Sequence, residues 1–335
     1  MAYTYGDIKM ALEKAHIVPG DTVFLHSSLL DLGKLSDVAP QDAAGKVTDA
    51  ILEYLGPEGT LVVPAFSWEY YRGHSYSVDD TPCEPDMGIL NEYLRKRPGA
   101  TRTLHPGQSL ACIGRLAGQL ASEDLDFASA WDKDGPIGVL EANNAKTIML
   151  GPPKWGTCSI IHYVEEELSV PYRFWKTYTG QYKAPGRDGY ETKTYTFFAR
   201  QFEPFEWDTC MDPVGKLLEE ENVLKHAVLG KGSLVAFSWK DMIPVLRAKL
   251  REDPYFVAVA KPGVPKAPHT PNVEVSIPAQ VFKSWIKGMP KELKNELGLS
   301  PSGGVESILE TRVKKILSEI LNPVFVELTR YLLKK

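Results

Sequence analysis

Short, continuous apolar runs alternate with segments of helical periodicity between residues 5 and 150. The apolar runs, each bounded by Gly, Pro or polar residues, are 22–25, 60–64, 110–113 and 147–150. The segments with apolar positions at helical spacing are 5–15, 47–55, 88–96 and 116–120. A short run that is apolar throughout predicts a strand buried on both faces and covered by helices. We therefore expect an α/β fold with a three-layer α/β/α core.

A different pattern occupies residues 174–200. Aromatic and polar residues alternate there, as in Thr194-Tyr195-Thr196-Phe197. A period of two predicts antiparallel strands with one face toward water. Together with the buried strands above, this predicts a mixed central sheet. Residues 67–85 are rich in Tyr, Ser, Asp and Pro, and they predict a surface loop.

The composition changes near residue 261. Residues 261–271 contain four prolines and predict an extended linker. Beyond it, apolar residues recur at helical spacing from Val305 to Ile320. We therefore divide the chain into a folded domain, 1–260, and a Pro-rich linker with a helical C-terminal extension, 261–335. The apolar stripe of the extension would pack on the core or on a second copy of the chain, which would make a homo-oligomer.

Charge and composition exclude several classes of protein. The 335 residues include 38 Lys and Arg against 43 Asp and Glu, so the net charge of −5 argues against a nucleic-acid partner. No apolar run reaches the ~20 residues that span a bilayer, and the first residues carry no secretion signal, so we expect a cytoplasmic protein without a membrane partner. The four cysteines lie far apart, and no second histidine stands at zinc-ligand spacing from His162. We therefore expect neither a disulfide framework nor a metal site.

The segment 157–168, shortly after the last apolar run, carries the most informative pattern of reactive residues. Ser159, His162 and Glu165 recur every three residues, so on a helix they would share one face. A carboxylate next to an imidazole orients it as a general base, and a hydroxyl one turn earlier suits an oxyanion. The same pattern is typical of an ordinary helix start, where Ser and Thr cap the helix and Glu residues offset its dipole. The residues alone leave both interpretations open.

Two further polar segments adjoin predicted strands. His26, Ser27 and Ser28 follow the first strand, where their hydroxyls and amides could hold a phosphate or thioester oxygen. Arg102 and Ser109 lie in one polar loop with a histidine between them, a combination that suits an anionic ligand. Ordinary turns would explain the same residues without any ligand.

Five segments, in this order, resemble the aminoglycoside 3-N-acetyltransferase family. They are 25–33, 56–67, 80–95, 102–109 and 157–173. The second reads Gly-Pro-Glu-Gly-Thr-Leu-Val-Val-Pro-Ala-Phe-Ser, nearly residue for residue as in the family. The last begins Thr-Cys-Ser-Ile-Ile-His-Tyr-Val-Glu and is similar to the family's Thr-x-Thr-x-x-His-x-x-Glu signature, with Ser159 in place of the second Thr. Ordered matches across about 25–260 favour the catalytic interpretation of His162.

The resemblance implies that 1–260 is an acyl-CoA-dependent N-acyltransferase domain. It implies direct transfer from acetyl-CoA, or another short acyl-CoA, to a small-molecule amine such as an aminoglycoside. His162 would take a proton from the amine, Glu165 would orient the imidazole, and Ser159 would steady the oxyanion. We expect the coenzyme to contact His26, Ser27, Ser28, Leu29, Arg102 and Ser109. We expect the acceptor to contact Phe66, Trp68, His105 and Glu166.

The acceptor and the reaction class have alternatives. An aminoglycoside is a polycation, so its binding site should contain Asp and Glu. These residues cluster at 203–208 and 219–221. A nucleotide-linked amino sugar of surface-polysaccharide biosynthesis calls for cations and aromatic rings, as in 172–176. A Cys- or Ser-dependent amide hydrolase using Cys158 or Ser159 would show ping-pong kinetics instead. A non-catalytic binding protein would release no thiol from acetyl-CoA.

Overall fold

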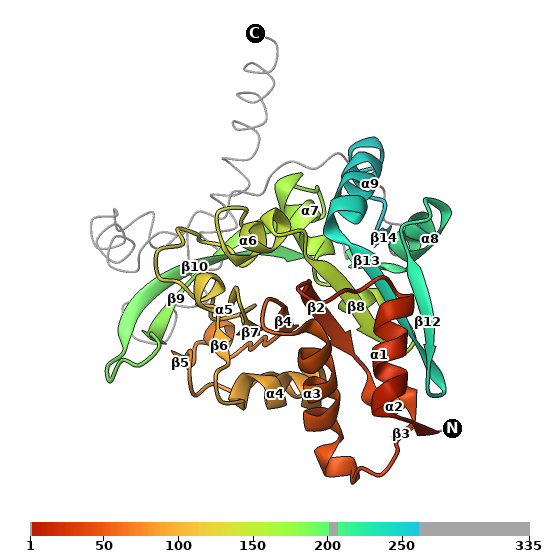
Figure 1. Ribbon diagram of the computed structural model, residues 1–335. Coiled ribbons are helices and arrows are strands. Elements are labelled where there is room, and N and C mark those ends of the chain that lie inside the picture. The colour runs from red at the N-terminus through yellow and green to blue at the C-terminus, as the bar shows by residue number, and fades with distance from the viewer. Residues whose placement is uncertain (1, 201–206, 261–335) are drawn as a thin grey trace, which may run out of the picture. The chain divides into compact units, whose positions relative to one another are not determined.

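A seven-stranded sheet lies at the centre of the fold, and the computed structural model describes residues 2–200 and 207–260 (Figure 1). The strand order is β12-β13-β8-β2-β4-β7-β6. Its members are β2 (Thr22–Ser27), β4 (Thr60–Pro64), β6 (Thr101–Arg102), β7 (Leu110–Gly114), β8 (Lys146–Leu150), β12 (Lys225–Leu229) and β13 (Gly232–Ser238). β8, β2 and β4 run parallel, and the other neighbours pair antiparallel. The expected mixed sheet is confirmed, but its antiparallel pairs involve β7 and β13, and the strands within 174–200 on which the expectation rested lie in another sheet.

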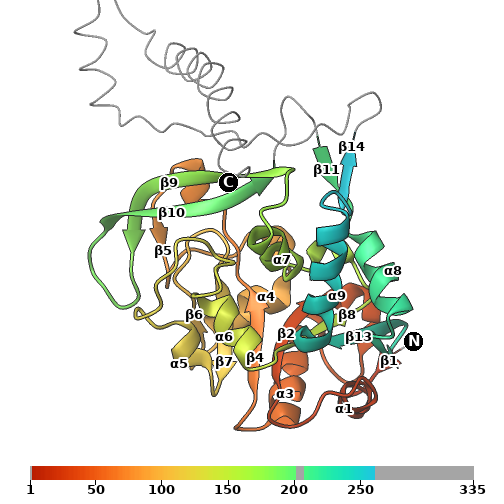
Figure 2. The same ribbon diagram turned by 90° about the horizontal axis from the view of Figure 1, so that it is seen from above.

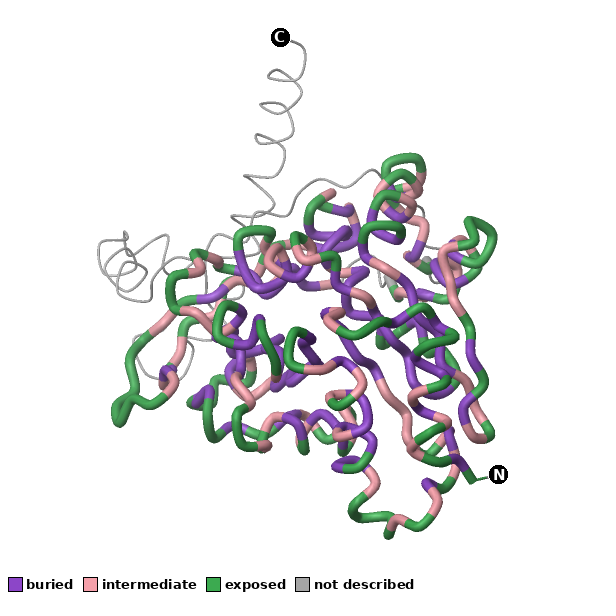
Figure 3. Tube along the Cα trace, in the orientation of Figure 1, coloured by how far each residue is buried: buried purple, intermediate pink, exposed green. Residues whose placement is uncertain are grey.

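Helices cover both faces of this sheet (Figure 2). One face packs against α1 (Tyr5–Lys14), α3 (Ala43–Leu55) and α4 (Ile89–Lys96). The other packs against α5 (Ala117–Leu120), α6 (Pro136–Ala142), α7 (Ile161–Glu167), α8 (Asp212–Glu220) and α9 (Trp239–Glu252). Side chains of β2 alternate between the two cores, with Phe24 in one and Val23 and Leu25 in the other. This alternation explains the uniformly apolar run and confirms the three-layer α/β/α class. The parallel strands β2, β4 and β8 are coloured mainly as buried in Figure 3.

Smaller elements surround the main sheet. The expected strands within 174–200 are β9 (Arg173–Lys183) and β10 (Glu191–Arg200), which join β5 (Tyr76–Ser77) in a three-stranded sheet. Two short pairs are β1 (Ala2–Tyr3) with β3 (Lys34–Leu35) and β11 (Trp207–Thr209) with β14 (Ala258–Ala260). The remaining helical turns are α2 (Leu29–Leu32), η1 (Pro40–Asp42), η2 (Tyr70–Arg72), η3 (Pro85–Met87) and η4 (Trp155–Thr157).

The structure differs from the sequence expectation in two places near the site. Residues 67–85, expected to be a surface loop, contain η2 and β5 because Tyr70 and Tyr76 are buried in a third hydrophobic cluster. The helix expected from Ser159 begins at Ile161, so Ser159 lies in the turn before it. In the described ranges no helix is both long and apolar enough to cross a bilayer. The extension expected within 261–335 lies outside the described residues.

Candidate active site

The carboxyl ends of the neighbouring parallel strands β2 and β8 bring two polar loops together. The backbone N–H of Ser28 donates to the carbonyl oxygen of Leu150 over 2.8 Å. Gly151 follows with a φ of +101°, and a Cβ at this position would stand 3.1 Å from the Ser28 carbonyl oxygen. Glycine therefore suits the point where the two loops meet. The edge at which such strands end is the usual location of a site in an α/β sheet.

His162 and Glu165 form a contact along α7. Nδ1 of His162 lies 2.5 Å from Oε2 of Glu165. The Glu165 side chain is fully buried, whereas the His162 side chain is 28% exposed. Among the described residues none forms a hydrogen bond with Nε2 of His162. One nitrogen of the imidazole is thus held by the protein, and the other is available for proton transfer.

Tyr172 and Arg173 hold the Glu165 carboxylate in its buried position. The Tyr172 hydroxyl donates to Oε1 over 2.6 Å, and Nη2 of Arg173 lies 2.9 Å from Oε2. Burial by itself raises the pKa of Glu165, but the charge of Arg173 and the neighbouring His162 outweigh it and lower the pKa to about 2. The carboxylate is therefore ionised at neutral pH, where it can stabilise an imidazolium.

The contacts around His162 decide its tautomer. Nη2 of Arg173 also lies 3.2 Å from Nδ1 of His162. Because Nδ1 faces the Glu165 carboxylate, Nδ1 carries the hydrogen, and the two nitrogens are donors that share one acceptor oxygen. The neutral imidazole then has its lone pair on Nε2. The Trp131 ring stands 5.7 Å from the His162 ring at 67°, and it limits rotation of the imidazole.

Ser159 and Cys158 lie in the turn that precedes α7. The Ser159 hydroxyl donates to the Thr157 carbonyl oxygen over 3.2 Å, and the Ser159 carbonyl accepts the His162 N–H over 3.0 Å. Cys158 is buried, and burial raises the pKa of its thiol well above the ordinary value. A thiol that is kept protonated is a poor nucleophile.

Glu166 lies beside the pair in a less polar setting. Its Oε2 accepts the hydroxyl of Ser129 over 2.6 Å. Burial raises the pKa of Glu166 to about 7, although the hydrogen bond from Ser129 opposes the shift. Trp131, two residues after Ser129, donates its indole N–H to Oε1 of Gln108 over 2.9 Å. Trp131 thus links the His162 region to the loop that ends at Ser109.

Two of the aromatic residues expected to contact the acceptor adjoin Trp131. The Phe66 ring centroid is 6.3 Å from that of Trp131 in an edge-on arrangement. The Trp68 ring is 6.0 Å from that of Phe66. The structure therefore brings Phe66, Trp68 and Glu166 to the Trp131 side of His162. Their contact with an acceptor stays a prediction.

His105 is enclosed within the fold. Its Nδ1 accepts the backbone N–H groups of Gly107 and Gln108 over 3.3 and 3.1 Å, and its Nε2 donates to the Thr196 carbonyl over 3.3 Å. Burial lowers the pKa of His105 to about 4, so the ring is neutral. These hydrogen bonds of His105 join its loop to β10. Contact of His105 with an acceptor stays a prediction.

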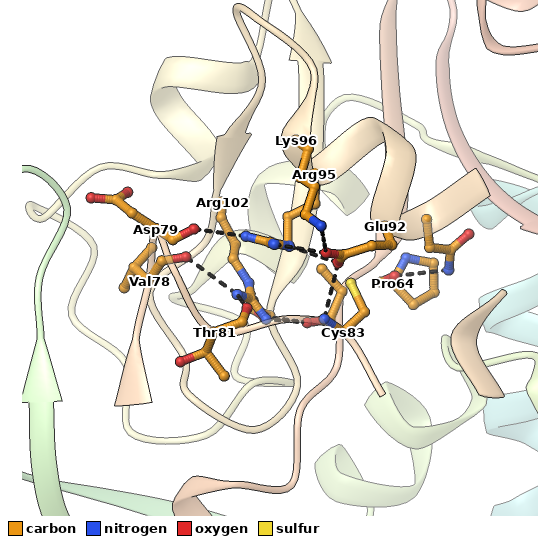
Figure 4. A network of polar contacts seen from close by, with 12 residues as sticks. Pro64, Val78, Asp79, Thr81, Cys83, Glu92, Arg95, Lys96 and Arg102 are labelled. Atoms are coloured by element: carbon orange, nitrogen blue, oxygen red, sulfur yellow. Dashed lines mark hydrogen bonds and ion pairs between the residues drawn. The ribbon is translucent and has the colours of Figure 1, made fainter. Parts of the chain in front are cut away.

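Arg102 lies in a buried network of polar contacts that includes Val78 and Thr81 (Figure 4), and Ser109 belongs to the same network. Nη2 of Arg102 donates to the Ala65 carbonyl over 2.6 Å, and Nη1 donates to the carbonyls of Val78 and Thr81 over 3.2 and 2.5 Å. Nε donates to the Ser109 hydroxyl over 2.8 Å, and this hydroxyl donates to the Ala65 carbonyl. These contacts tie several chain segments together. Contact of either residue with the coenzyme stays a prediction.

The segment after β2 reaches the loop of β8. The Ser28 hydroxyl donates to Oδ2 of Asp31 over 2.5 Å, and Nζ of Lys154 lies 2.9 Å from the same oxygen. Ser27 and Leu29, on either side of Ser28, are partly exposed. His26 is buried, its Nε2 has no partner among the described residues, and burial lowers its pKa to about 4. The expected coenzyme contacts of this segment stay predictions.

Comparison with known proteins identifies the family. The sequence model described as "Aminoglycoside 3-N-acetyltransferase" matches residues 24–251. The chain belongs to this family. The matched range includes His162, Glu165 and the network around Arg102. Membership confirms the expected class of enzyme, an acyltransferase acting on an amino group.

The chain covers about two thirds of the length of the curated aminoglycoside 3-N-acetyltransferases that it matches. Aminoglycoside N(3)-acetyltransferase III from a Salmonella species is 29% identical over 204 residues, which cover 56% of this chain and 68% of that enzyme. Aminoglycoside N(3)-acetyltransferase IX from Micromonospora chalcea is 26% identical over 196 residues, covering 52% of this chain and 66% of that enzyme.

Solved structures of the family share the fold. Aminoglycoside acetyltransferase AAC(3)-Xa superposes with a TM-score of 0.64 at 23% identity, covering 75% of this chain and 93% of that one. AAC-IIIb in a binary complex with CoASH gives a TM-score of 0.65 at 19% identity, covering 75% of this chain and 97% of that one. These superpositions support the α/β/α architecture.

Sequence reasoning missed several residues that shape this family member's site. Tyr172 and Arg173 lie in a segment that contributes to the family resemblance, but their hydrogen bonds to Glu165 depend on a turn that the pattern does not reveal. Ser129 and Trp131 lie in a stretch without periodicity, and the sequence carries no signal for their contacts with Glu166 and Gln108. Among the described residues, no three His, Cys, Asp or Glu side chains are grouped to hold a metal ion.

Proposed function

We propose that this protein is an N-acyltransferase that moves a short acyl group, acetyl first of all, from acyl-CoA to an amine of a sugar-like acceptor. The observation that carries the proposal is the His162–Glu165 contact of 2.5 Å, which leaves Nε2 as the free nitrogen of a partly exposed imidazole. An amine is protonated at neutral pH and becomes a nucleophile only when a base removes its proton.

The proposed reaction takes place in one complex of enzyme, acyl-CoA and acceptor. The ammonium first releases one proton to solvent. The neutral amine nitrogen then attacks the thioester carbonyl carbon, and Nε2 of His162 takes the second proton from this nitrogen as the C–N bond forms. The tetrahedral intermediate then collapses, the C–S bond breaks, and the proton held by His162 goes to the leaving CoA thiolate. The buried carboxylate of Glu165 stabilises the imidazolium between these steps. Reorientation of the Ser159 hydroxyl away from Thr157 would let it donate to the oxyanion.

The coenzyme is assigned to the loops at the carboxyl ends of β2 and β8. Ser27, Ser28 and Leu29 lie at this edge, and the Ser28 backbone is already bonded to the β8 loop. A related enzyme of the same fold has been solved with CoASH, which supports a coenzyme A substrate for this family member. The buried positions of Arg102 and Ser109 favour an indirect contribution, through the shape of the neighbouring loop.

The acceptor is assigned from the family and from the site. Relatives are named aminoglycoside N(3)-acetyltransferases, and one solved structure is a complex of AAC(3)-IVa with apramycin. These names support an aminoglycoside-like amine as the first acceptor class to test. The hydrolase alternative is disfavoured because burial raises the pKa of the Cys158 thiol and the Ser159 hydroxyl lacks a contact with His162.

A thiol-release assay tests the proposal. Acetyl-CoA and longer acyl-CoA donors are incubated with aminoglycosides and amino sugars, and the free thiol and the acylated amine are measured together. Stoichiometric formation of both, with intersecting initial-rate lines, is the expected result. Thiol release without an acylated amine, or no release with any acceptor, would contradict the proposal.

A further inference from the structure

Arg173, the first residue of β9, contacts both members of the proposed catalytic pair. Its Nη2 lies 2.9 Å from Oε2 of Glu165 and 3.2 Å from Nδ1 of His162. Its Nη1 donates to the Phe198 carbonyl on β10 over 3.3 Å. Only 8% of the Arg173 side chain is exposed. The guanidinium is therefore fixed next to the imidazole, where water screens its charge weakly.

The three side chains form an interior group whose net charge depends on the proton of His162. With a neutral imidazole, the Glu165 carboxylate and the Arg173 guanidinium cancel. Tyr172 adds a hydrogen bond but no charge, because burial raises the pKa of its hydroxyl well above the usual range. Without Arg173, the group would be free of net charge only when His162 is protonated. Because an interior group favours the state without net charge, Arg173 favours the neutral imidazole.

Other titratable side chains near His162 act in the opposite direction. Glu166, on the next turn of α7, and Asp132, in the loop that precedes α6, are carboxyl groups, and their ionised forms would favour a protonated imidazole. Burial raises the pKa of Glu166 to about 7, so a large share of it is uncharged at neutral pH, and Asp132 is partly exposed to water. Among the described residues, no other Lys or Arg forms a hydrogen bond or ion pair with His162 or Glu165. Arg173 is thus the contacting cation that opposes protonation of His162.

We propose that Arg173 is a positioning residue whose charge keeps the imidazole of His162 unprotonated and ready to act as a base at neutral pH. The inference rests on the proposed function, because it presupposes proton transfer to Nε2. A buried carboxylate alone would favour an imidazolium, which has no lone pair for the proton of the amine. Glu165 stabilises the imidazolium that forms during transfer, and Arg173 limits this stabilisation so that the proton can pass on to the CoA thiolate.

The pH dependence of kcat/KM tests the inference in the full-length enzyme. The substrates are acetyl-CoA with kanamycin A, or with 2-amino-2-deoxyglucose where that sugar gives faster thiol release. The amine of the acceptor titrates identically with every variant, so differences between the profiles report on the enzyme. Arg173→Gln removes the charge and keeps a side chain that can donate a hydrogen bond. We expect its acid limb to move to higher pH by about one unit, so that kcat/KM falls at pH 7 and recovers toward the wild-type value at pH 9.

Two further variants separate the charge of Arg173 from its packing. Arg173→Lys keeps a positive charge and should leave the acid limb near its wild-type position, even where kcat is lower. Glu165→Gln removes the opposite charge and should move the acid limb to lower pH. A general loss of structure would not shift the limb in opposite directions for Arg173→Gln and Glu165→Gln.

A double variant keeps the test independent of the folding of Arg173→Gln, which leaves the Glu165 carboxylate buried without its cation. Arg173→Gln combined with Glu165→Gln leaves no unpaired charge in the interior. The step from Glu165→Gln to this double variant removes the charge of Arg173 and should again move the acid limb to higher pH.

Arg247→Gln is the matched control. Arg247, on α9, pairs with Glu167 of α7 over 2.8 Å and is 25% exposed, so it belongs to an ion pair of the same helix that does not include His162. The variant removes the same charge as Arg173→Gln and should leave the acid limb at its wild-type position.

The possible results separate this inference from the proposed function. An acid limb at higher pH after loss of the Arg173 charge, with an unchanged limb in Arg173→Lys and Arg247→Gln, supports the inference. An unchanged limb, or a loss of activity that is equal at every pH, would overturn the role of Arg173 while leaving the transferase intact. Absence of thiol release from the wild-type enzyme with every acceptor would overturn the proposed function itself.

Discussion

Nδ1 of His162 and Oε2 of Glu165 lie 2.5 Å apart within α7, and the carboxylate is fully buried. A single contact therefore fixes both the tautomer and the direction of the imidazole. The geometry depends on Arg173 and Tyr172, because an isolated buried carboxylate would otherwise take up a proton. Both the activity and the acid stability of the enzyme should therefore depend on these side chains.

His162→Ala should lower kcat by roughly 10²–10⁴-fold, because the amine loses its general base. Binding of acetyl-CoA, measured by titration calorimetry, should change little. His162→Gln is a useful companion because it keeps a polar side chain of similar length but cannot accept a proton at neutral pH. Turnover within a few-fold of wild type in both variants would remove His162 from the chemistry.

Tyr172→Phe should make the protein more sensitive to acid. The Tyr172 hydroxyl stabilises the ionised form of Glu165, whose pKa is lowered from 4.5 to about 2. A lowered pKa contributes stability that is present above about pH 4.5 and lost as the pH falls toward 2. Losing one hydrogen bond to a charged group should reduce the free energy of unfolding by about 2 kcal/mol at pH 7.

The measurement is urea unfolding between pH 2 and pH 7. The acid transition of Tyr172→Phe should move to higher pH, because Glu165 protonates more easily. Tyr190→Phe, at an exposed position, is the control and should follow the wild-type curve. Identical acid transitions in wild type and Tyr172→Phe would show that the hydroxyl does not stabilise the carboxylate.

Glu166→Gln should stabilise the protein at alkaline pH. Burial raises the pKa of Glu166 from 4.5 to about 7, so the folded state binds more protons than the unfolded chain between these values. The contribution of Glu166 to the free energy of unfolding is then highest below about pH 4.5 and declines as the pH rises through 7. A pKa difference of this size corresponds to about 3 kcal/mol.

The test compares free energies of unfolding at pH 5 and pH 8. The wild-type protein should lose stability across this interval, and Glu166→Gln should lose less of it. Glu221→Gln changes the same charge at an exposed position and should leave the decline in place. An equal decline in all three proteins would assign the pH dependence to other groups.

Arg102→Lys should destabilise the fold by about 3 kcal/mol, because a lysine cannot reproduce the separate donors that Arg102 directs at Ala65, Val78, Thr81 and Ser109. The same variant tests the coenzyme role expected from the sequence. A structural role predicts lower stability with an almost unchanged KM for acetyl-CoA. A raised KM with normal stability would favour direct coenzyme contact.

Cys158→Ala should retain most of the transferase activity. The thiol is buried, and its raised pKa keeps it protonated. Neither the wild type nor the variant should show a pre-steady-state burst, because direct transfer forms no acyl-enzyme. A loss of activity comparable to that of His162→Ala, at unchanged stability, would support the hydrolase-type mechanism instead.

The sequence was most informative about features that depend on neighbouring residues alone, such as an apolar strand or the spacing of two residues on a helix. The run Thr60–Pro64 was predicted as a buried strand and is β4, because each of its side chains lies in an interior covered by helices. The spacing of His162 and Glu165 predicted their contact on a helix, and the structure shows it. The helix was expected to begin at Ser159 but begins two residues later, at Ile161, because Ser and Glu near a helix start do not define its first residue.

The surroundings of these residues were decided by tertiary structure. Arg102 and His105 stand in a polar loop whose sequence suits a ligand, yet their hydrogen bonds run to Ala65 and Thr196. A side chain can be assigned to the interior or to a site only when its partners from distant segments are known. The same reason applies to Trp131, whose neighbours His162 and Gln108 lie on different elements.

By itself the sequence determined the layer architecture, the family and the pair His162 and Glu165, because periodicity and short spacings are local properties of the chain. Only the tertiary structure decided that the Glu165 carboxylate is buried and ionised. Tyr172 and Arg173 follow α7 in the chain and Trp131 precedes it by a loop, and their effect on pKa and packing arises when folding brings them within contact distance of Glu165 and His162.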